Sequence, residues 1–209
     1  MAEAPATEES RRTRILRAAF EEFYRNGFQA GSLNHIVASA GATKGALFHH
    51  FENKQELGYA VVDEVIQPSG RRRWLDLLEQ ESDPVEAIKA CFRRNIAEDI
   101  EVRTTLECGC PLNNLAQEMS PLDEGFRQRI EAGYRVWREA LAAALERGKQ
   151  LGHVREDVSS GAAAALIVAG QMGIWGTAKN SQDGELMRRA AEGLYAYLDS
   201  LRPSRAASV

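Results

Sequence analysis

The sequence predicts an all-α protein in which an N-terminal helix-turn-helix domain of three short helices precedes a larger helical body. Two features carry this prediction. Apolar residues recur every three or four positions along most of the 209 residues, which is the spacing of one face of an α-helix. Glycine, proline and capping residues fall between these periodic segments, where helices begin and end. Hydrophobic residues make up 44% of the chain and charged residues 27%, as in a folded globular protein.

The first ten residues, MAEAPATEES, predict a disordered leader. They are acidic and lack the apolar core of a secretion signal. The helix that follows carries Ile15, Ala19 and Phe23 on one apolar face. Gly27 is expected to end this helix, because glycine readily adopts the left-handed conformation found at helix C-termini.

Two short helices joined by a tight turn come next. Ser32 is placed to cap the first, and Gly41 closes it after only about two turns. Thr43 is placed to cap the second, in which Leu47 and Phe51 share one face. The link between the two helices spans about three or four residues, which is the length that a helix-turn-helix requires.

A fourth helix is expected to begin at Asn53, with Glu56 three residues later as in a capping box. The sequence PSG at residues 68–70 is expected to end it, so we place the boundary of a first domain, residues 11–70, at this point. Residues 71–209 form the body. Its expected helices are one starting at Trp74–Leu78, one from Pro84 to about Ile96, a short one over LNNLAQEM, and longer ones near residues 122–148, 158–179 and 183–201.

The charge is unevenly distributed along the chain. The net charge is +4 over residues 11–54, −3 over the ten residues before them and −5 over residues 55–209, which gives −4 in total. Three of the four histidines also lie in the basic segment. A small basic module on an acidic body is suited to a protein that meets a polyanion at one end only.

The third helix is the candidate element for contacting that polyanion. Leu47 and Phe51 already fix its inward face. The small residues Gly45 and Ala46 let the helix backbone come close to DNA, and Lys44 would then face a phosphate or a base edge. The residues left for the outer surface are Thr43, Lys44, Gly45 and His49.

The same segment does not fit a nucleotide or a metal site. A P-loop needs its lysine after a longer glycine-spaced loop that follows a strand, and no strand-like segment precedes Lys44. Adjacent residues on a helix point about 100° apart, so His49 and His50 do not form a metal site. We expect His50 to be a half-buried residue at the helix end, and we expect neither a cofactor nor a metal.

The segment TRILRAAFEEFYRNGFQAGSLNHIVASAGATKGALFHHFENKQEL, from Thr13 to Leu57, closely resembles the DNA-binding domain of the TetR family of one-component transcriptional regulators. The GATKGALFHHFENK block and the AAFEEFYRNGF helix carry most of this resemblance. It implies that the partner is a double-stranded DNA operator. The residues that it implies for DNA binding are Ser32, Thr43, Lys44, Gly45, Phe48, His49 and Lys54.

The resemblance also implies roles for these residues. Ser32 and Thr43 would cap their helices and touch phosphate. Lys44, Gly45 and His49 would lie on the groove-facing surface of the recognition helix.

Three further positions lie around that surface. Lys54 would hold the DNA backbone from the flank. Phe48 stands where the family usually has tyrosine, whose hydroxyl often reaches a phosphate, and phenylalanine cannot make that bond. Gly31 stands where the family often has threonine, so any hydroxyl contact from that position is lost.

The body resembles the effector-binding and dimerisation domain of the same family. This implies a homodimer in which helices 158–179 and 183–201 form a four-helix interface with their copies, and we place Leu194 at that contact. The segment CGCPLNNLAQEMS resembles a subgroup that includes NemR-like and AcuR-like sensors of electrophiles and small unsaturated compounds. Effector cavities are mostly apolar with a few polar groups. The candidate lining residues are Cys108, Asn113, Tyr134, Trp137, Met172 and Trp175.

The sequence thus predicts a cytoplasmic, homodimeric repressor that a small-molecule effector releases from a palindromic operator. Three cysteines do not make a disulfide framework, and no apolar run reaches the ~18 residues that span a bilayer.

Two alternatives remain open. One is a regulator of the same fold that senses electrophiles or oxidants through Cys108 or Cys110, with a thiol pKa lowered by a helix N-terminus and Arg103. Cys108 is favoured, because Cys110 directly precedes a proline, is held extended and is expected to turn inward. The other is a helical enzyme that uses Cys108 or His153 as nucleophile or base, for which the sequence shows no orienting third group.

Overall fold

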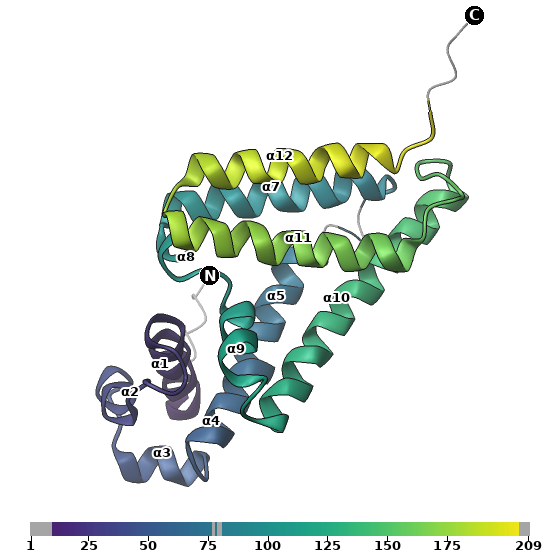
Figure 1. Cartoon of the computed structure of the whole chain (residues 1–209). Coiled ribbons are helices and arrows are strands. Elements are labelled where there is room, and N and C mark those ends of the chain that lie inside the picture. The colour runs from purple at the N-terminus through teal and green to yellow at the C-terminus, as the bar shows by residue number, and fades with distance from the viewer. Residues whose placement is uncertain (1–9, 77, 79–80, 205–209) are drawn as a thin grey trace, which may run out of the picture.

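The computed structural model describes residues 10–204, apart from residues 77, 79 and 80. Every regular element in that part of the chain is helical, which confirms the all-α prediction (Figure 1). Of the leader expected at residues 1–10, only Ser10 belongs to the described residues. Leu77, expected in a helix of the body, lies outside them. The elements in chain order are α1 (Arg11–Asn26), α2 (Leu33–Ser39), α3 (Lys44–His50), α4 (Lys54–Val61), the π-helical turn η1 (Val62–Ile66), α5 (Gln67–Trp74), α7 (Pro84–Val102), α8 (Thr104–Cys108), α9 (Pro111–Met119), α10 (Glu124–Gln150), α11 (Ser160–Ser181) and α12 (Gly184–Ser200).

The helices form two parts of unequal size (Figure 1). α1, α2 and α3 pack together at one end as a helix-turn-helix unit, which we call the DNA-binding unit. α7, α11 and α12 run side by side across the opposite end. α10 runs from that layer towards the DNA-binding unit, and the run from α4 to α5 lies beside it together with α9. The DNA-binding unit and the body therefore meet along α4, α9 and α10.

Side-chain caps confirm the expected starts of the short helices. Ser32, Thr43 and Asn53 each accept a hydrogen bond from the backbone N–H three residues later, at 3.4, 3.2 and 2.9 Å respectively. Ser10, which we assigned to the leader, caps α1 in the same way at 3.1 Å. Gly27 follows α1 with a φ of 80°, as expected for a glycine at a helix C-terminus.

The predicted helix break at residues 68–70 is wrong. α4, η1 and α5 form one helical run from Lys54 to Trp74. Pro68 lies in the first turn of α5, directly after the π-helical turn, and the first turn of a helix tolerates the missing N–H of proline. Gly70 serves packing instead of ending the helix, because a Cβ there would lie 2.9 Å from the ring of Trp137. The expected domain boundary at residue 70 therefore falls inside a helix.

Aromatic side chains join the DNA-binding unit to the body. Phe126 of α10 is fully buried, and its ring centroid lies 4.7 Å from that of Phe28 and 4.9 Å from that of Tyr59. Gly58 of α4 makes room for this contact, since a Cβ there would lie 2.6 Å from both phenylalanine rings. The Tyr59 hydroxyl also donates to Asp123 Oδ1 at 2.7 Å. These contacts hold the DNA-binding unit against α10.

α11 is long and apolar enough to cross a membrane by length and composition, with a mean hydropathy of 1.3 over its most apolar window. It packs against α8, α10 and α12 inside the body, and 44% of that window is buried. A core helix meets the same test of length and composition, so this finding is weak evidence for a membrane span.

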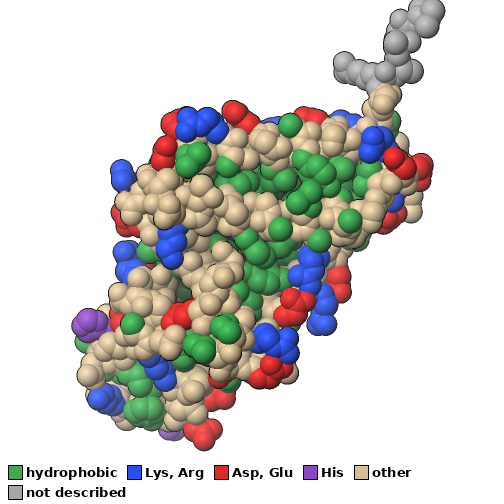
Figure 2. Space-filling view, in the orientation of Figure 1, with side chains coloured by type: hydrophobic (Ala, Val, Ile, Leu, Met, Phe, Trp, Pro, Cys, Tyr) green, Lys and Arg blue, Asp and Glu red, His purple; other side chains and the backbone are tan. Residues whose placement is uncertain are grey.

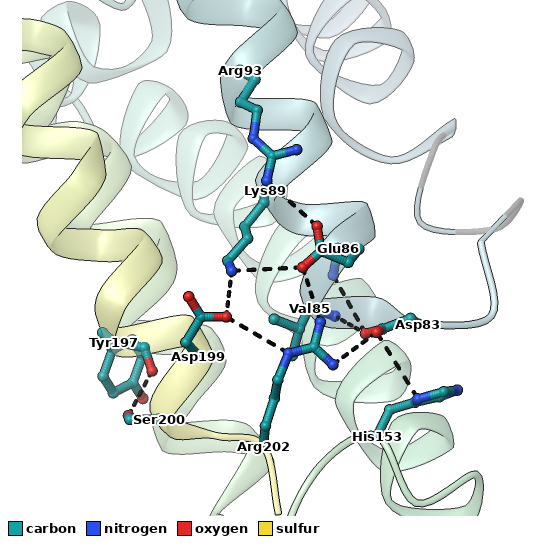
Figure 3. A network of polar contacts seen from close by, with 10 residues as sticks. All are labelled: Asp83, Val85, Glu86, Lys89, Arg93, His153, Tyr197, Asp199, Ser200 and Arg202. Atoms are coloured by element: carbon teal, nitrogen blue, oxygen red, sulfur yellow. Dashed lines mark hydrogen bonds and ion pairs between the residues drawn. The ribbon is translucent and has the colours of Figure 1, made fainter. Parts of the chain in front are cut away.

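An ion-pair network ties the end of α12 to the start of α7 (Figure 3). Lys89, buried in α7, donates to Asp199 and lies 3.6 Å from Glu86. Arg202 reaches Asp83 at 2.8 Å and Glu86 at 3.0 Å. Both cations therefore join the last helix of the body to its first long helix.

We expect this network to make the protein sensitive to acid. Burial raises the pKa of Asp83, but the hydrogen bond and charge of Arg202, together with hydrogen bonds from the backbone N–H groups of Glu86 and Val85, hold that pKa below its usual value. The hydrogen bond from Lys89 likewise lowers the pKa of Asp199. A carboxylate whose pKa is lowered by folding contributes stability above its unfolded pKa of about 4, and this contribution is lost as pH falls through the folded value. Urea unfolding between about pH 7 and pH 3 should therefore show the steepest loss below about pH 4.

The variant Arg202→Met tests the cause of that acid sensitivity. It should lower the free energy of unfolding at neutral pH by about 1–3 kcal/mol, because it removes charge-assisted hydrogen bonds. It should also flatten the loss in acid. Arg135→Met is the control, since it removes only an exposed pair with Glu139 and should change the free energy of unfolding by less than about 1 kcal/mol. Identical pH profiles for Arg202→Met and the wild type would contradict this prediction.

Candidate DNA-binding surface and ligand cavity

The turn between α2 and α3 is compact. Gly41 has a φ of 58°, a conformation that side chains rarely adopt, and its N–H donates to Ala38 O at 3.2 Å. The next N–H, that of Ala42, donates to Val37 O at 2.9 Å. These bonds close the C-terminus of α2, so that the chain turns within residues 40–43 and α3 begins directly afterwards. The turn has the length that the sequence predicts.

α3 has one buried face and one exposed face. Leu47 is fully buried and Phe51 is nearly so, as predicted. The exposed residues include Lys44, Gly45, Phe48 and His49. Phe48 is 47% exposed although it is large and apolar. His50 is exposed at the helix end, so the expectation that it is half-buried is wrong.

Ser32 and Thr43 use their hydroxyl oxygens as helix caps beside this surface. The Ser32 N–H also donates to the Glu22 carboxylate at 2.8 Å, which fixes the start of α2 on α1. Gly31 is glycine for a packing reason. A Cβ at that position would lie 2.6 Å from the Phe23 ring, so a threonine there would require Phe23 to move.

Lys54 is engaged with the protein itself. Its Nζ donates to Gln29 O at 3.0 Å and lies 5.1 Å from the centroid of the Phe28 ring. Burial lowers the pKa of Lys54, and the nearby charges of Glu118 and Glu22 oppose that shift. Contact between Lys54 and the DNA backbone stays a prediction. In this structure the side chain supports the turn between α1 and α2.

Glu118, near the end of α9, holds the same turn from the body. Its two carboxylate oxygens accept hydrogen bonds from the backbone N–H groups of Phe28 and Gln29, at 2.9 and 2.8 Å. Gly27 leaves the space that this requires, because a Cβ there would lie 3.1 Å from a Glu118 oxygen. Hydrogen bonds to a carboxylate are stronger than those between neutral groups. We call this arrangement the Glu118 clamp, and it links the body directly to the DNA-binding unit.

A cavity of about 490 Å³ lies between the DNA-binding unit and the body. α1 forms one wall, α5 and α11 form others, and the chain from α8 to the start of α9 completes it. This volume is typical of a site for a small molecule. A smaller apolar recess of about 30 Å³ shares Trp74, Trp137 and Gln171 with the cavity. The larger side chains of the cavity wall include Phe20, Tyr24, Trp74, Trp137, Gln171 and Trp175.

Asp99 is the buried polar centre beside this cavity. Its Oδ1 accepts hydrogen bonds from Arg73 at 2.8 Å and from the Thr105 hydroxyl at 2.9 Å. Its Oδ2 accepts one from the indole N–H of Trp175 at 2.7 Å. Arg73, Thr105 and Trp175 all line the cavity, so one carboxylate fixes side chains on three of its walls.

Two comparisons of sequence decide the family. Residues 15–61 match the profile of the bacterial regulatory proteins of the tetR family, and residues 84–194 match the tetracyclin repressor-like C-terminal domain. The chain belongs to the TetR family. It is 30% identical over 207 residues to ArpR, a probable HTH-type transcriptional regulator of Pseudomonas putida, covering 95% of this chain and 96% of ArpR. It is 33% identical over 132 residues to the HTH-type transcriptional regulator LmrA of Bacillus subtilis, covering 60% of this chain and 66% of LmrA, just under two thirds of that relative.

Solved structures of TetR-family proteins share the fold. A TetR transcriptional regulator from Chloroflexus aurantiacus has a TM-score of 0.80 and 26% identity, covering 90% of this chain and 93% of its own. The reduced form of E. coli NemR has a TM-score of 0.80 at 22% identity, covering 95% of this chain and all of its own, and this likeness shows the fold alone. The predicted family is confirmed, and the protein is a DNA-binding transcriptional regulator of the TetR family.

The cavity of this TetR-family regulator contains two of the six predicted effector residues, Trp137 and Trp175. The others are not among the described residues that line it: Cys108, Asn113, Tyr134 and Met172. Tyr134 is buried in the core and Met172 packs at the edge of the core. Nothing in the geometry supports contact between these four residues and a ligand in this cavity, so such contact stays a prediction.

The walls that α1 and α5 provide were not predicted from the sequence. Phe20 and Tyr24 belong to the first helix of the DNA-binding unit, and Trp74 ends α5. No sequence signal connects these residues to α11, because they meet only through tertiary packing. Gln171 did carry a signal. It is a polar residue within an apolar helix, one turn before Trp175 on the same face.

The placement of the cysteines does not favour a thiolate sensor. All three are buried. Cys108 is the last residue of α8, and the helix N-terminus that we assigned to it belongs to Cys110. Burial raises the pKa of the Cys110 thiol.

His153, the other candidate nucleophile or base, lies 3.9 Å from Asp83, a carboxylate already bound by Arg202 in the ion-pair network (Figure 3).

We expect Lys44 and His49 to contribute differently to operator binding. Lys44→Ala should weaken binding to every sequence and reduce the slope of log affinity against log salt by about one, because one phosphate contact is lost. His49→Ala should instead reduce the preference for the operator over a mutated operator, by about 1–3 kcal/mol if its ring contacts a base edge. Fluorescence anisotropy across a salt series measures both effects. Glu139→Ala, on the exposed surface of α10, is the control. An equal loss on all sequences would assign His49 to the DNA backbone.

Proposed function

We propose that this TetR-family regulator is a homodimeric, cytoplasmic repressor that leaves a near-palindromic operator when a small molecule enters the cavity. The supporting observation is that α1 of the DNA-binding unit forms one wall of the cavity, through Phe20 and Tyr24. α1 also packs against both α2 and α3. A ligand shifts a conformational equilibrium only through contacts that differ between the two states, and this wall can supply such contacts.

α9 provides a second connection between the cavity and the DNA-binding unit. Cys110, Pro111 and Leu112 at its N-terminus line the cavity, while the Glu118 clamp lies near its other end. The Tyr24 hydroxyl of α1 donates to the backbone carbonyl just before this helix, at 2.5 Å. A ligand that displaces the N-terminus of α9 would therefore also move the clamp. In a dimer, this movement would change the separation of the two recognition helices.

Glu118→Gln tests this connection. The amide keeps the size of the side chain but offers one acceptor where the carboxylate offers two. We expect faster hydrogen exchange at the N–H groups of Phe28 and Gln29, and operator affinity lower by about three- to tenfold, because the DNA-binding unit is held less firmly. Hydrogen-exchange mass spectrometry and anisotropy measure the two effects.

The control for this variant is Glu107→Gln, at an exposed position on α8. It should change neither the exchange at the turn nor the operator affinity. Faster exchange at the turn with unchanged operator affinity would show that the clamp does not position the DNA-binding unit.

The outer face of α11 and α12 supports the proposed homodimer. Figure 2 shows hydrophobic side chains gathered on the surface of this layer. The exposed residues of α11 there are small or apolar, namely Ala162, Ala165, Leu166, Ala169 and Gly173. The large apolar side chain of Leu166 is 50% exposed. α12 adds three half-buried residues to this face, Leu186, Ala190 and Tyr197. An apolar face with small residues allows close helix packing, which suits a symmetric contact with a second copy.

Leu194, which we placed at the dimer contact, is not exposed on this face. It is buried within the chain, between α11 and α12, where a Cβ on Gly170 would lie 3.4 Å from it. A charge at this position would disturb folding as well as assembly, so it does not test the interface. Leu166 is the better position.

Leu166→Arg should convert the proposed dimer to a monomer, because it places an unpaired charge in an apolar contact. Sedimentation should show half the mass, and footprinting should show loss of the two-fold symmetric operator complex. Leu122→Arg, at a leucine that is 62% exposed in the turn before α10, should leave the mass unchanged. A dimer that persists in Leu166→Arg would place the interface on another surface.

A further inference from the structure

We propose that the effector is an uncharged, flat aromatic molecule that carries a hydrogen-bond donor, and that this donor binds Oε1 of Gln171. The inference rests on the proposed function, since it takes the cavity as the effector site. Three properties of the cavity wall lead to it: the aromatic rings, the pairing of the charged side chains, and the lack of a partner for one buried amide oxygen.

Five aromatic side chains line the cavity. The three tryptophans of the chain, Trp74, Trp137 and Trp175, all line it. The ring centroid of Trp74 lies 6.1 Å from that of Trp137 and 5.3 Å from that of Trp175. Phe20 and Tyr24, stacked with centroids 5.5 Å apart, add two further rings from α1. Aromatic side chains prefer offset-stacked or edge contacts with other rings, so these walls favour a flat aromatic ligand.

The charged side chains of the wall already have partners. Arg73 lies 2.8 Å from the Asp99 carboxylate. Arg25 lies 3.9 Å from Glu21, and both of these residues line the cavity. A charged ligand would be buried without a free counter-ion or would have to displace one of these pairs. Because burial of an unpaired charge costs far more than burial of a neutral group, the cavity favours an uncharged ligand.

Gln171 supplies the polar specificity. It is 4% exposed, and it lines both the cavity and the adjoining recess. Its Oε1 has no hydrogen-bond partner within the described part of the chain. A buried acceptor without a partner is unfavourable, and an N–H or O–H of a ligand would satisfy it.

Three hydrogen-bond donors elsewhere on the wall already have acceptors. The indole N–H of Trp175 and the hydroxyl of Thr105 both donate to Asp99. The Tyr24 hydroxyl donates to a backbone carbonyl. These groups would have to give up their own hydrogen bonds to reach Gln171. The donor for Oε1 is therefore assigned to the ligand.

Indole and 1-methylindole form a matched pair of probes for this assignment. Both are flat, neutral and aromatic, and they differ in the single N–H donor that the methyl group replaces. Isothermal titration calorimetry on the protein without DNA should show that the wild type binds indole about three- to tenfold more tightly, which corresponds to one neutral hydrogen bond. This ratio requires no variant and is informative by itself.

Gln171→Met then shows which atom is responsible. Methionine has a similar length but no oxygen acceptor, so the preference for indole should fall to about onefold while affinity for 1-methylindole stays equal or rises. Gln128→Met, at an exposed position on α10, should keep the wild-type ratio. Circular dichroism confirms that each variant is folded. Should Gln171→Met not fold, the wild-type ratio still decides the proposal.

Three results would overturn the proposal: equal affinity of the wild type for both probes, an unchanged preference in folded Gln171→Met, or no binding of either probe at roughly millimolar concentration. Operator binding is measured separately on the same preparations. Selective indole binding without any operator complex would contradict the proposed repressor and leave the chemistry of the cavity standing. An operator complex together with equal affinity for the two probes would support the proposed repressor and contradict the proposed effector chemistry.

Discussion

The position of the recognition helix depends on the packing of Phe126 between the DNA-binding unit and the body. This ring is fully buried against Phe28 and Tyr59, and it fits only because Gly58 has no side chain. Close packing of this kind transmits movement, because rings in contact cannot slide without opening space. Glu118 adds a directional contact at the neighbouring turn. Because of these two contacts, the orientation of α3 depends on α9 and α10 of the body as well as on the DNA-binding unit.

The cavity lies next to this junction and leaves empty volume in the interior. Empty volume removes dispersion contacts, and the unpartnered oxygen of Gln171 adds a further cost. The opposite end of the body is held by Lys89 and Arg202, whose ion pairs join α7 to α12. A rearrangement around the cavity would therefore involve both α1 of the DNA-binding unit and α9 of the body. This location suits a regulatory site.

Several features of the DNA-binding unit were predictable from the sequence. The caps at Ser32, Thr43 and Asn53, the positive φ at Gly27 and the buried face of α3 all depend on residues close together in the chain. The prediction was wrong where residues typical of a helix break instead make a packing contact with a distant part of the chain. The segment at residues 68–70 reads as a helix break, yet α5 continues through it because a π-helical turn precedes Pro68 and because the glycine packs on the Trp137 ring.

Most of the helices, the family and the outer surface of the recognition helix could be predicted without a structure, since each follows from periodicity, capping and motif spacing within short segments. The set of residues that forms the cavity depends on tertiary packing. Phe20, Trp74 and Gln171 come from three helices far apart in the chain, and no spacing rule relates them. Tertiary packing also decided that Leu194 faces inward while Leu166 faces outward. Both belong to apolar helices, and the direction of a face in such a helix depends on its neighbours.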